Sequence, residues 1–115
     1  MSVQTILNIG LIDDYKQSLG VEIIRQMLDL YIAQSAIYLE EIRSAASSSD
    51  HLLWHDKCHK MKGAASSIGF IVLRELLLSI EHSDAGEQVK LDYCAQLNQL
   101  NIEAITAFEA WITSS

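Results

Sequence analysis

The sequence predicts an all-α protein, built as an up-down-up-down antiparallel four-helix bundle with a short additional N-terminal helix. The 115 residues include no proline and only five glycines, so little in the chain interrupts a helix. Half of the residues are hydrophobic, which is enough for one core, and the length suits one domain rather than two. We therefore expect a single domain over residues 1–115, with the bundle core at about 20–112.

The N-terminal part of the chain predicts one short and one long helix. The first ten residues are weakly patterned, and a short helix is expected over 13–19, with Asp13 as its N-cap and Gly20 as its stop. A long helix is expected over 21–46, because its apolar residues recur with a period near 3.6. These residues are Ile24, Met27, Leu28, Tyr31, Tyr38, Ile42 and Ala45. Three serines at 47–49 predict the loop that follows.

The rest of the chain predicts three more helices. Asp50 is a suitable N-cap for a helix over 51–68, which Gly69 would end. The next helix is expected over 72–83 and the last over 91–112. The inward residues of the helix over 51–68 are Trp54, Cys58, Met61, Ala65 and Ile68. Those of the helix over 72–83 are Leu73, Leu76, Leu77 and Ile80, and those of the helix over 91–112 are Tyr93, Leu97, Leu100, Ala104, Phe108 and Trp111. Amphipathic helices joined by short loops pack most simply as an antiparallel bundle.

A basic spot lies on this otherwise acidic chain. The formal net charge is −7, which argues against nucleic-acid binding. Yet three of the eight basic residues, Lys57, Lys60 and Lys62, surround His59 in the sequence. Such a spot favours an acidic site on a partner protein. A solvated helix face that carries lysines by chance would look the same in the sequence.

The cysteines and the apolar runs indicate the cellular compartment in which the chain is expected. Cys58 and Cys94 make no disulfide framework and occupy apolar helix positions, so we expect buried free thiols in a reducing compartment. No N-terminal segment combines a positive region with an apolar run, so we expect no signal peptide. The apolar run over 70–80 is broken by Arg74 and Glu75, so it is too short to span a membrane. We expect a soluble, cytoplasmic chain.

The helix over 51–68 carries the candidate site at His59. His59, Lys62 and Gly63 share one face, because positions i, i+3 and i+4 are neighbours on a helix. His59 lies about 100° from Cys58 and therefore off the apolar stripe, in water. Its neighbours on that outer face are His55, Lys62, Gly63 and Ser66. Glycine costs about 1 kcal/mol against alanine inside a helix, so Gly63 suggests that something approaches His59 closely.

These residue types suit the carriage of a phosphoryl group. A neutral imidazole is a good nucleophile, and an ordinary pKa near 6.5 keeps much of it neutral at cytoplasmic pH. Lys62 would stabilise the charge of the phosphoryl oxygens, and Gly63 would leave room for a partner's loop.

The run His59-x-x-Lys62-Gly63-x-x-x-x-x-Gly69 resembles the signature of histidine-containing phosphotransfer (HPt) domains of two-component phosphorelays. The long upstream helix, the small-residue loop after it and the downstream Leu73-x-x-Leu76 pattern also resemble that family, over about 20–112.

The resemblance implies a phosphorelay intermediate. His59 would accept a phosphoryl group from a receiver-domain aspartate, in a hybrid sensor kinase or a response regulator, and pass it to another receiver domain. Glu81, on the following helix, would accept the Nδ1–H of His59 and turn the other nitrogen outward. A solvated helix charge is the alternative interpretation. Lys62 and Gly63 match the family's motif. Partner contacts are expected at His55, Lys57, Lys60, Ser66 and Gly69.

The sequence carries no Gly-rich phosphate loop and no Walker-type lysine, so we expect a phosphoryl carrier without kinase activity or ATP binding. No cofactor is expected on the chain itself, and magnesium would come with the receiver partner. The partners would be receiver domains, with no nucleic acid and no membrane, and the chain would be a monomer.

Two other functions compete with this interpretation. His51, His55 and His59 follow a zinc-ligand spacing of i, i+4, although one helix cannot wrap a tetrahedral ion. The other alternative is a helical adaptor that binds a partner without chemistry. Phosphate uptake by His59 from a receiver would distinguish a phosphotransfer domain from such an adaptor. His82 is expected near a helix end, where an imidazolium suits the helix dipole, and no role is assigned to it.

Overall fold

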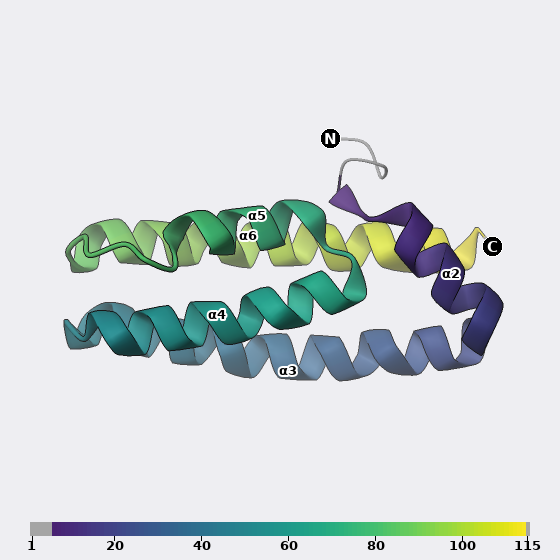
Figure 1. Cartoon of the computed structure of the whole chain (residues 1–115), viewed down its shortest axis with the longest axis horizontal. Helices are drawn as coiled ribbons and strands as arrows, with labels where there is room; N and C mark the ends of the chain where they lie inside the picture. Colours follow the sequence, from purple (N-terminus) through teal and green to yellow (C-terminus); the bar gives the residue numbers. More distant parts are fainter. Residues whose placement is uncertain (1–5, 115) are drawn as a thin grey trace.

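The computed structural model describes residues 6–114 as an all-α protein (Figure 1). Its helices are α2 (Ile9–Leu19), α3 (Val21–Ser48), α4 (His51–Ile68), α5 (Ile71–Ile80) and α6 (Glu87–Thr113). Helices α3 to α6 run alternately in opposite directions, as the sequence predicts, and α2 is the short additional helix near the N-terminus. None of the helices in this described part of the chain is long and apolar enough to cross a membrane.

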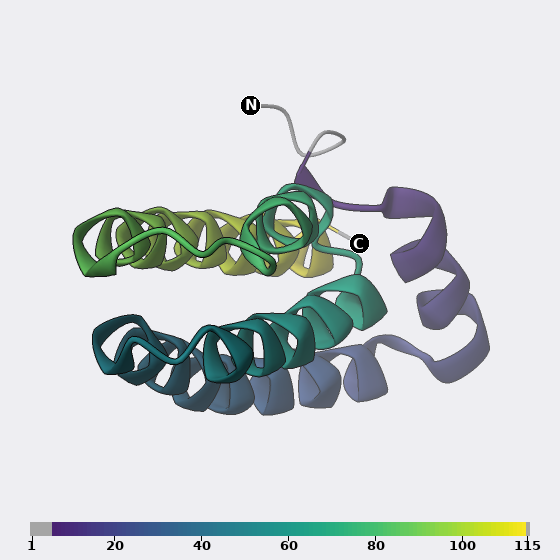
Figure 2. The ribbon, with the colours of Figure 1, turned by 60° about the vertical axis from the view of Figure 1, so that its left-hand side comes forward.

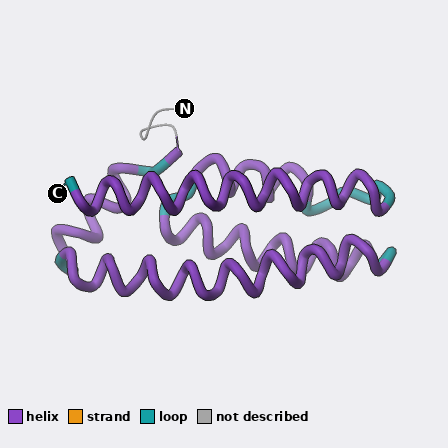
Figure 3. The backbone as a smooth tube through the Cα atoms, turned by 180° about the vertical axis from the view of Figure 1, so that it is seen from behind, coloured by secondary structure: helices purple, strands orange, loops and turns teal. Residues whose placement is uncertain are grey.

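The four bundle helices pack in a ring. Helix α3 contacts α4 and α6, and α5 contacts the same two helices. Figure 2 shows α3 and α4 as one layer and α5 and α6 as the other, with α2 crossing one end of the bundle. Short connections join consecutive helices, as the tube in Figure 3 shows. The ring leaves the outer face of α4 exposed at His59, Lys60, Gly63 and Ser66.

Two predicted boundaries near the N-terminus are wrong. Helix α2 begins at Ile9, because Asn8 caps it: the Asn8 Oδ1 accepts the Leu11 N–H at 3.1 Å. Asp13, the predicted cap, lies inside α2 and accepts a hydrogen bond from Gln17. Helix α3 continues through the first two of the predicted loop serines to Ser48, and the next residue, Ser49, takes a left-handed conformation. Small polar residues are compatible with a last helical turn as well as with a loop, so composition alone misplaced the end.

The later boundaries differ less. Helix α4 has the predicted bounds, with Asp50 accepting the Leu53 N–H at 3.0 Å and Gly69 in a left-handed conformation after its last residue. Helix α5 ends at Ile80, three residues before the predicted end, and the chain then turns at Glu81. Helix α6 begins four residues before the predicted start. Periodicity did not detect its first turn, because that turn carries no inward apolar residue apart from the methylene stem of Lys90.

Gly69, one of the expected partner contacts, lies beneath the N-terminal segment and not on the exposed face of α4. The segment before α2 folds over Gly69: the Asn8 N–H donates to the Gly69 carbonyl at 2.8 Å, and Leu7 bridges to Phe70. Gly69 is buried, and a Cβ there would lie 3.2 Å from Ile12. With φ of 81°, this position needs glycine to end α4 and to let the N-terminal segment pass.

The core is apolar, with one buried polar network between the two longest helices. Phe70 packs edge-on against Tyr31 and Phe108, with ring centroids 4.8 and 6.0 Å apart. Tyr31 donates to the Asn101 Oδ1 at 2.6 Å, and the Asn101 amide donates to the Ser35 hydroxyl at 3.1 Å. This network ties α3 to α6 and satisfies polar groups that burial would otherwise leave unpaired.

The two cysteines are free thiols, as expected, although only one is fully buried. Burial raises the pKa of the Cys58 thiol to about 12. Cys94 is half-buried, and burial raises the pKa of its thiol as well. Neither thiol is a reactive thiolate at neutral pH.

Candidate functional site

His59 stands on the outer face of α4. Its side chain is 60% exposed, whereas Cys58 and Met61 on the same helix are fully buried. The periodicity of the apolar residues predicted this exposure, because one step along a helix turns a side chain about 100° away from the core. An exposed imidazole on a rigid helix is accessible to a partner protein.

A buried carboxylate lies beneath the exposed ring. The Glu81 Oε2 is 3.5 Å from the His59 Nδ1, and the Glu81 side chain is only 4% exposed. Within residues 6–114 this buried Oε2 has no hydrogen-bond partner. Buried carboxylate oxygens are normally paired, because an unpaired one costs about 1–3 kcal/mol or more. The interpretation of Glu81 as a solvated helix charge is therefore wrong.

Lys62 holds the other oxygen of this carboxylate. The Lys62 Nζ donates to the Glu81 Oε1 at 2.9 Å, and the lysine side chain is 18% exposed. Burial by itself raises the pKa of the Glu81 carboxyl. The hydrogen bond and charge of Lys62, together with His59, outweigh burial and keep that pKa below its ordinary value of 4.5. Glu81 is therefore ionised at neutral pH.

The ionised carboxylate selects a tautomer of His59. A carboxylate oxygen can only accept, so a bond to Oε2 requires hydrogen on Nδ1. We assign the Nδ1–H tautomer from the 3.5 Å contact between the His59 Nδ1 and this oxygen. The Nε2 lone pair then faces away from Glu81, on the exposed side of the ring.

The three lysines of the basic spot diverge. Lys57 forms an ion pair with Glu41 on α3 at 3.0 Å, and Lys62 turns toward Glu81. Lys60 is exposed and lines a groove between α3 and α4. The sequence could place these lysines around His59, but their acidic partners lie 16 and 19 residues away along the chain.

Gly63 leaves open space beside His59. A Cβ built at Gly63 would meet no atom of the described residues within 4 Å. Gly63 also lines the groove between α3 and α4, which holds about 340 Å³. Its lining residues are Met27, Leu30, Tyr31, Gln34, Tyr38, Lys60, Gly63, Ala64, Ser67 and Ile68. Ser66, the other expected neighbour, is exposed on the same helix.

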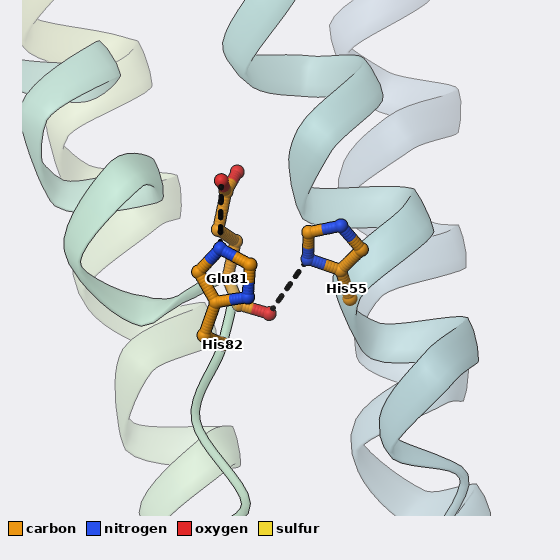
Figure 4. A group of neighbouring side chains, drawn as sticks. All are labelled: His55, Glu81 and His82. Carbon is orange, nitrogen blue, oxygen red and sulfur yellow. Dashed lines mark hydrogen bonds and ion pairs between the residues drawn. The ribbon is translucent and has the colours of Figure 1, made fainter.

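Two further imidazoles flank Glu81 (Figure 4). The His55 ring stacks between those of His59 and His82, at centroid distances of 5.7 and 4.6 Å. The His82 Nε2 is 3.5 Å from the Glu81 Oε1. Sequence reasoning gave His82 no role, because nothing in a single sequence shows that the turn after α5 faces α4.

The predicted histidine ladder is not a metal site. His51 accepts a hydrogen bond at its Nδ1 from the Lys90 Nζ, at 2.8 Å, and does not join His55 and His59. One helix sets i, i+4 side chains a full turn apart, so a third member of the ladder lies too far along the axis.

The comparisons with known proteins agree with this fold. A family model described as "Hpt domain" matches residues 26–110, and because it covers most of the sequence, the chain belongs to the Hpt domain family. The chain is thus a phosphotransfer domain of two-component systems, and domains of this family are phosphocarriers rather than kinases.

A solved structure of known function is similar to this chain in fold. It is the histidine-containing phosphotransfer domain of ArcB from Escherichia coli, with a TM-score of 0.84 over 96% of each chain and 21% sequence identity. A search of the curated proteins gave no match.

Proposed function

We propose that this chain carries a phosphoryl group on the Nε2 of His59, accepts it from the aspartyl phosphate of one receiver domain and passes it to another. One observation carries the choice of His59: an exposed imidazole whose Nδ1 lies 3.5 Å from a buried carboxylate oxygen that lacks any other partner among residues 6–114. The family match to an Hpt domain supports the reaction class.

The transfer is a substitution at phosphorus. The His59 Nε2 lone pair attacks the phosphorus of the aspartyl phosphate, an N–P bond forms, and the P–O bond to the aspartate breaks with the electron pair returning to that carboxylate. The ring gains positive charge as the bond forms. Glu81 accepts the Nδ1–H and stabilises this charge, and the reverse reaction on a second receiver restores the neutral ring.

Lys62 has two roles in this proposal. Its positive charge pairs with Glu81, and this ion pair keeps the carboxylate ionised and positioned under His59. Its Nζ also places a cation one helical turn from His59, where it stabilises charge on the phosphoryl oxygens.

The groove between α3 and α4 is the proposed contact surface for the receiver. It adjoins Gly63 and combines exposed apolar surface at Leu30 with the cation of Lys60. A receiver that brings an acidic phosphorylation pocket to His59 would meet Lys60 at its rim. His55 and Ser66 lie on the same outer region of α4, while Lys57 is engaged with Glu41.

The remaining parts of the chemistry belong to the receiver. We propose that magnesium and most catalytic groups come with the receiver domain, that this chain needs no cofactor of its own, and that it acts as a cytoplasmic monomer without ATP binding.

The test is phosphate uptake from a phosphorylated receiver, measured as acid-labile, alkali-stable phosphate on the chain. His59→Gln should abolish uptake and leave the helical content and melting temperature nearly unchanged, because the side chain is exposed. His51→Gln, the same change two turns earlier on α4, is the matched control and should retain uptake. Normal uptake by His59→Gln would overturn the assignment, and His55 would be examined next.

A further inference from the structure

Three side chains close to the proposed phosphosite form a cluster, and the proposed phosphotransfer uses only one of them, Glu81. His55 comes from α4, Glu81 caps α5, and His82 follows in the turn (Figure 4). Each offers one potential ligand atom, and these atoms all lie within 4.8 Å of one another. Two imidazoles and one carboxylate are a donor set that zinc prefers.

One ring nitrogen of His55 has a backbone partner. Its Nδ1 is 3.3 Å from the backbone carbonyl of Glu81. A carbonyl can only accept, so Nδ1 carries the hydrogen in this contact and Nε2 keeps its lone pair. A metal-binding histidine typically donates its other N–H to a carbonyl or carboxylate in this manner, which fixes both tautomer and ring orientation.

Glu81 and His82 complete the set from a single dipeptide. The Glu81 carboxylate is buried and ionised, with one oxygen unpaired among the described residues. The His82 side chain is 76% exposed, and its Nε2 lies 3.5 Å from the Glu81 Oε1. Ligand atoms on one tetrahedral zinc are about 3.4 Å apart. The His82–Glu81 pair is already near this separation, and side-chain rotations of His55 and the exposed His82 would have to bring the remaining ligand atoms, now up to 4.8 Å apart, closer together.

We propose that His55, Glu81 and His82 bind a divalent transition-metal ion, with Zn²⁺ as the best match and water in the fourth position. The ion competes with Lys62, whose Nζ now donates to the Glu81 Oε1. Binding is therefore reversible and weaker than in a structural zinc site.

Metal binding would also affect the phosphosite. An ion on Glu81 takes the carboxylate from Lys62 and withdraws negative charge from the His59 Nδ1. The metal-bound chain then accepts phosphate more slowly. This consequence rests on the proposed function of His59, whereas the metal site itself does not.

The site is tested by titrating Zn²⁺ into the untagged protein at pH 7.5, by calorimetry and by imidazole nitrogen NMR. One ion should bind per chain, with the signals of His55 and His82 shifting. His82→Ala and His55→Gln should each weaken binding about tenfold or more. Lys62→Gln should tighten it several-fold, because it removes the competing cation. His51→Ala, a histidine of α4 outside the cluster, should leave the affinity unchanged.

Equal affinity in His82→Ala and the unchanged protein would overturn the site, as would loss of binding in His51→Ala. The link to phosphotransfer is tested separately, by uptake from a phosphorylated receiver with and without Zn²⁺. Zinc should slow uptake by the unchanged protein and not by His82→Ala, which also controls for zinc acting on the receiver. Equal slowing of both would overturn the link. Absence of uptake without zinc would instead refute the proposed function and leave the titration result standing.

Discussion

Glu81 and Lys90 are both buried charged side chains, but the fold provides polar partners for their charged groups to different extents. Lys90 is 2% exposed, and its Nζ donates to the His51 Nδ1 at 2.8 Å and lies 5.1 Å from the centroid of a Trp54 ring. Glu81 is 3% exposed, and its Oε2 faces an exposed imidazole without a hydrogen bond from the described residues.

The difference separates a structural charge from a functional one. Lys90 is satisfied within the fold, by a hydrogen bond and a cation–π contact, so it links the starts of α4 and α6. Among the described residues Glu81 is hydrogen-bonded on one oxygen only, and its other oxygen, 3.5 Å from the His59 Nδ1, is attracted more strongly when the His59 ring carries positive charge. An unpaired buried acceptor beside an exposed nucleophile is the arrangement that favours a charged intermediate over the resting state.

Apart from the loss of His59 itself, the largest expected effect comes from removing the charge of Glu81. In Glu81→Gln the side chain keeps its size but no longer stabilises the charged His59 ring. A hydrogen bond to a charged group contributes about 1.5–3 kcal/mol, so the rate of phosphate transfer should fall roughly 10- to 100-fold. Single-turnover transfer from a phosphorylated receiver measures this. An unchanged rate would show that Glu81 is structural, as Lys90 is.

Lys90→Met should lower the stability of the fold and leave phosphate transfer unchanged. Methionine keeps much of the apolar stem but loses both polar contacts, so the free energy of unfolding should fall by about 1–3 kcal/mol. Phosphate uptake at a temperature where the variant is folded should not change. Urea unfolding together with the uptake assay checks both parts. A loss of uptake in the folded variant would contradict the division between the two charges.

Two lysines sharpen the comparison within α4. Lys60 is exposed, so Lys60→Glu should slow association with a receiver, and the effect should shrink with salt, since exposed charges are screened over about 8 Å at physiological ionic strength. Lys62 is bonded to Glu81, so Lys62→Ala should lower the transfer rate more than the affinity. Binding and single-turnover transfer, measured for both variants, separate the roles. Equal losses of affinity with no specific rate loss for Lys62→Ala would make Lys62 an ordinary surface cation.

The smallest expected effect is that of Gly63→Ala. A Cβ there meets no described atom within 4 Å, so Gly63→Ala should be neutral or stabilise the fold by up to about 1 kcal/mol. Transfer should continue in this variant and fall sharply in Gly63→Gln, whose side chain would occupy the approach to His59. Thermal unfolding and transfer assays of the two variants form the test. Normal transfer by Gly63→Gln would show that the open space is not an approach path.

Local patterns predicted much of this fold. The bounds of α4, its Asp50 cap and its Gly69 stop followed from residue types within a few positions, and the exposure of His59 followed from helical periodicity. The ends of α2, α3 and α5 were misplaced by a few residues, because serines and acidic residues suit both helix ends and loops.

The site was less accessible to such reasoning. Glu81 was placed under His59 only through the family resemblance, and the pairing of Lys90 with His51 was not foreseen. Gly69 was expected at the surface, because the sequence does not reveal that the segment at Leu7 folds over it. Each of these contacts joins residues far apart in the chain, where periodicity carries no information.

The length of α5 has a consequence for how this chain can vary. Helix α5 has ten residues, and Glu81 follows its last one. Inserting a single residue into α5 would turn Glu81 by about 100° and shift it by about 1.5 Å along the helix axis. The carboxylate would then no longer face His59, although the apolar composition of the helix would be almost unchanged. Apolar substitutions within α5 that preserve its packing therefore disturb the site less than insertions or deletions do, and the spacing between Phe70 and Glu81 is a better sign of a working site than the identity of the residues between them.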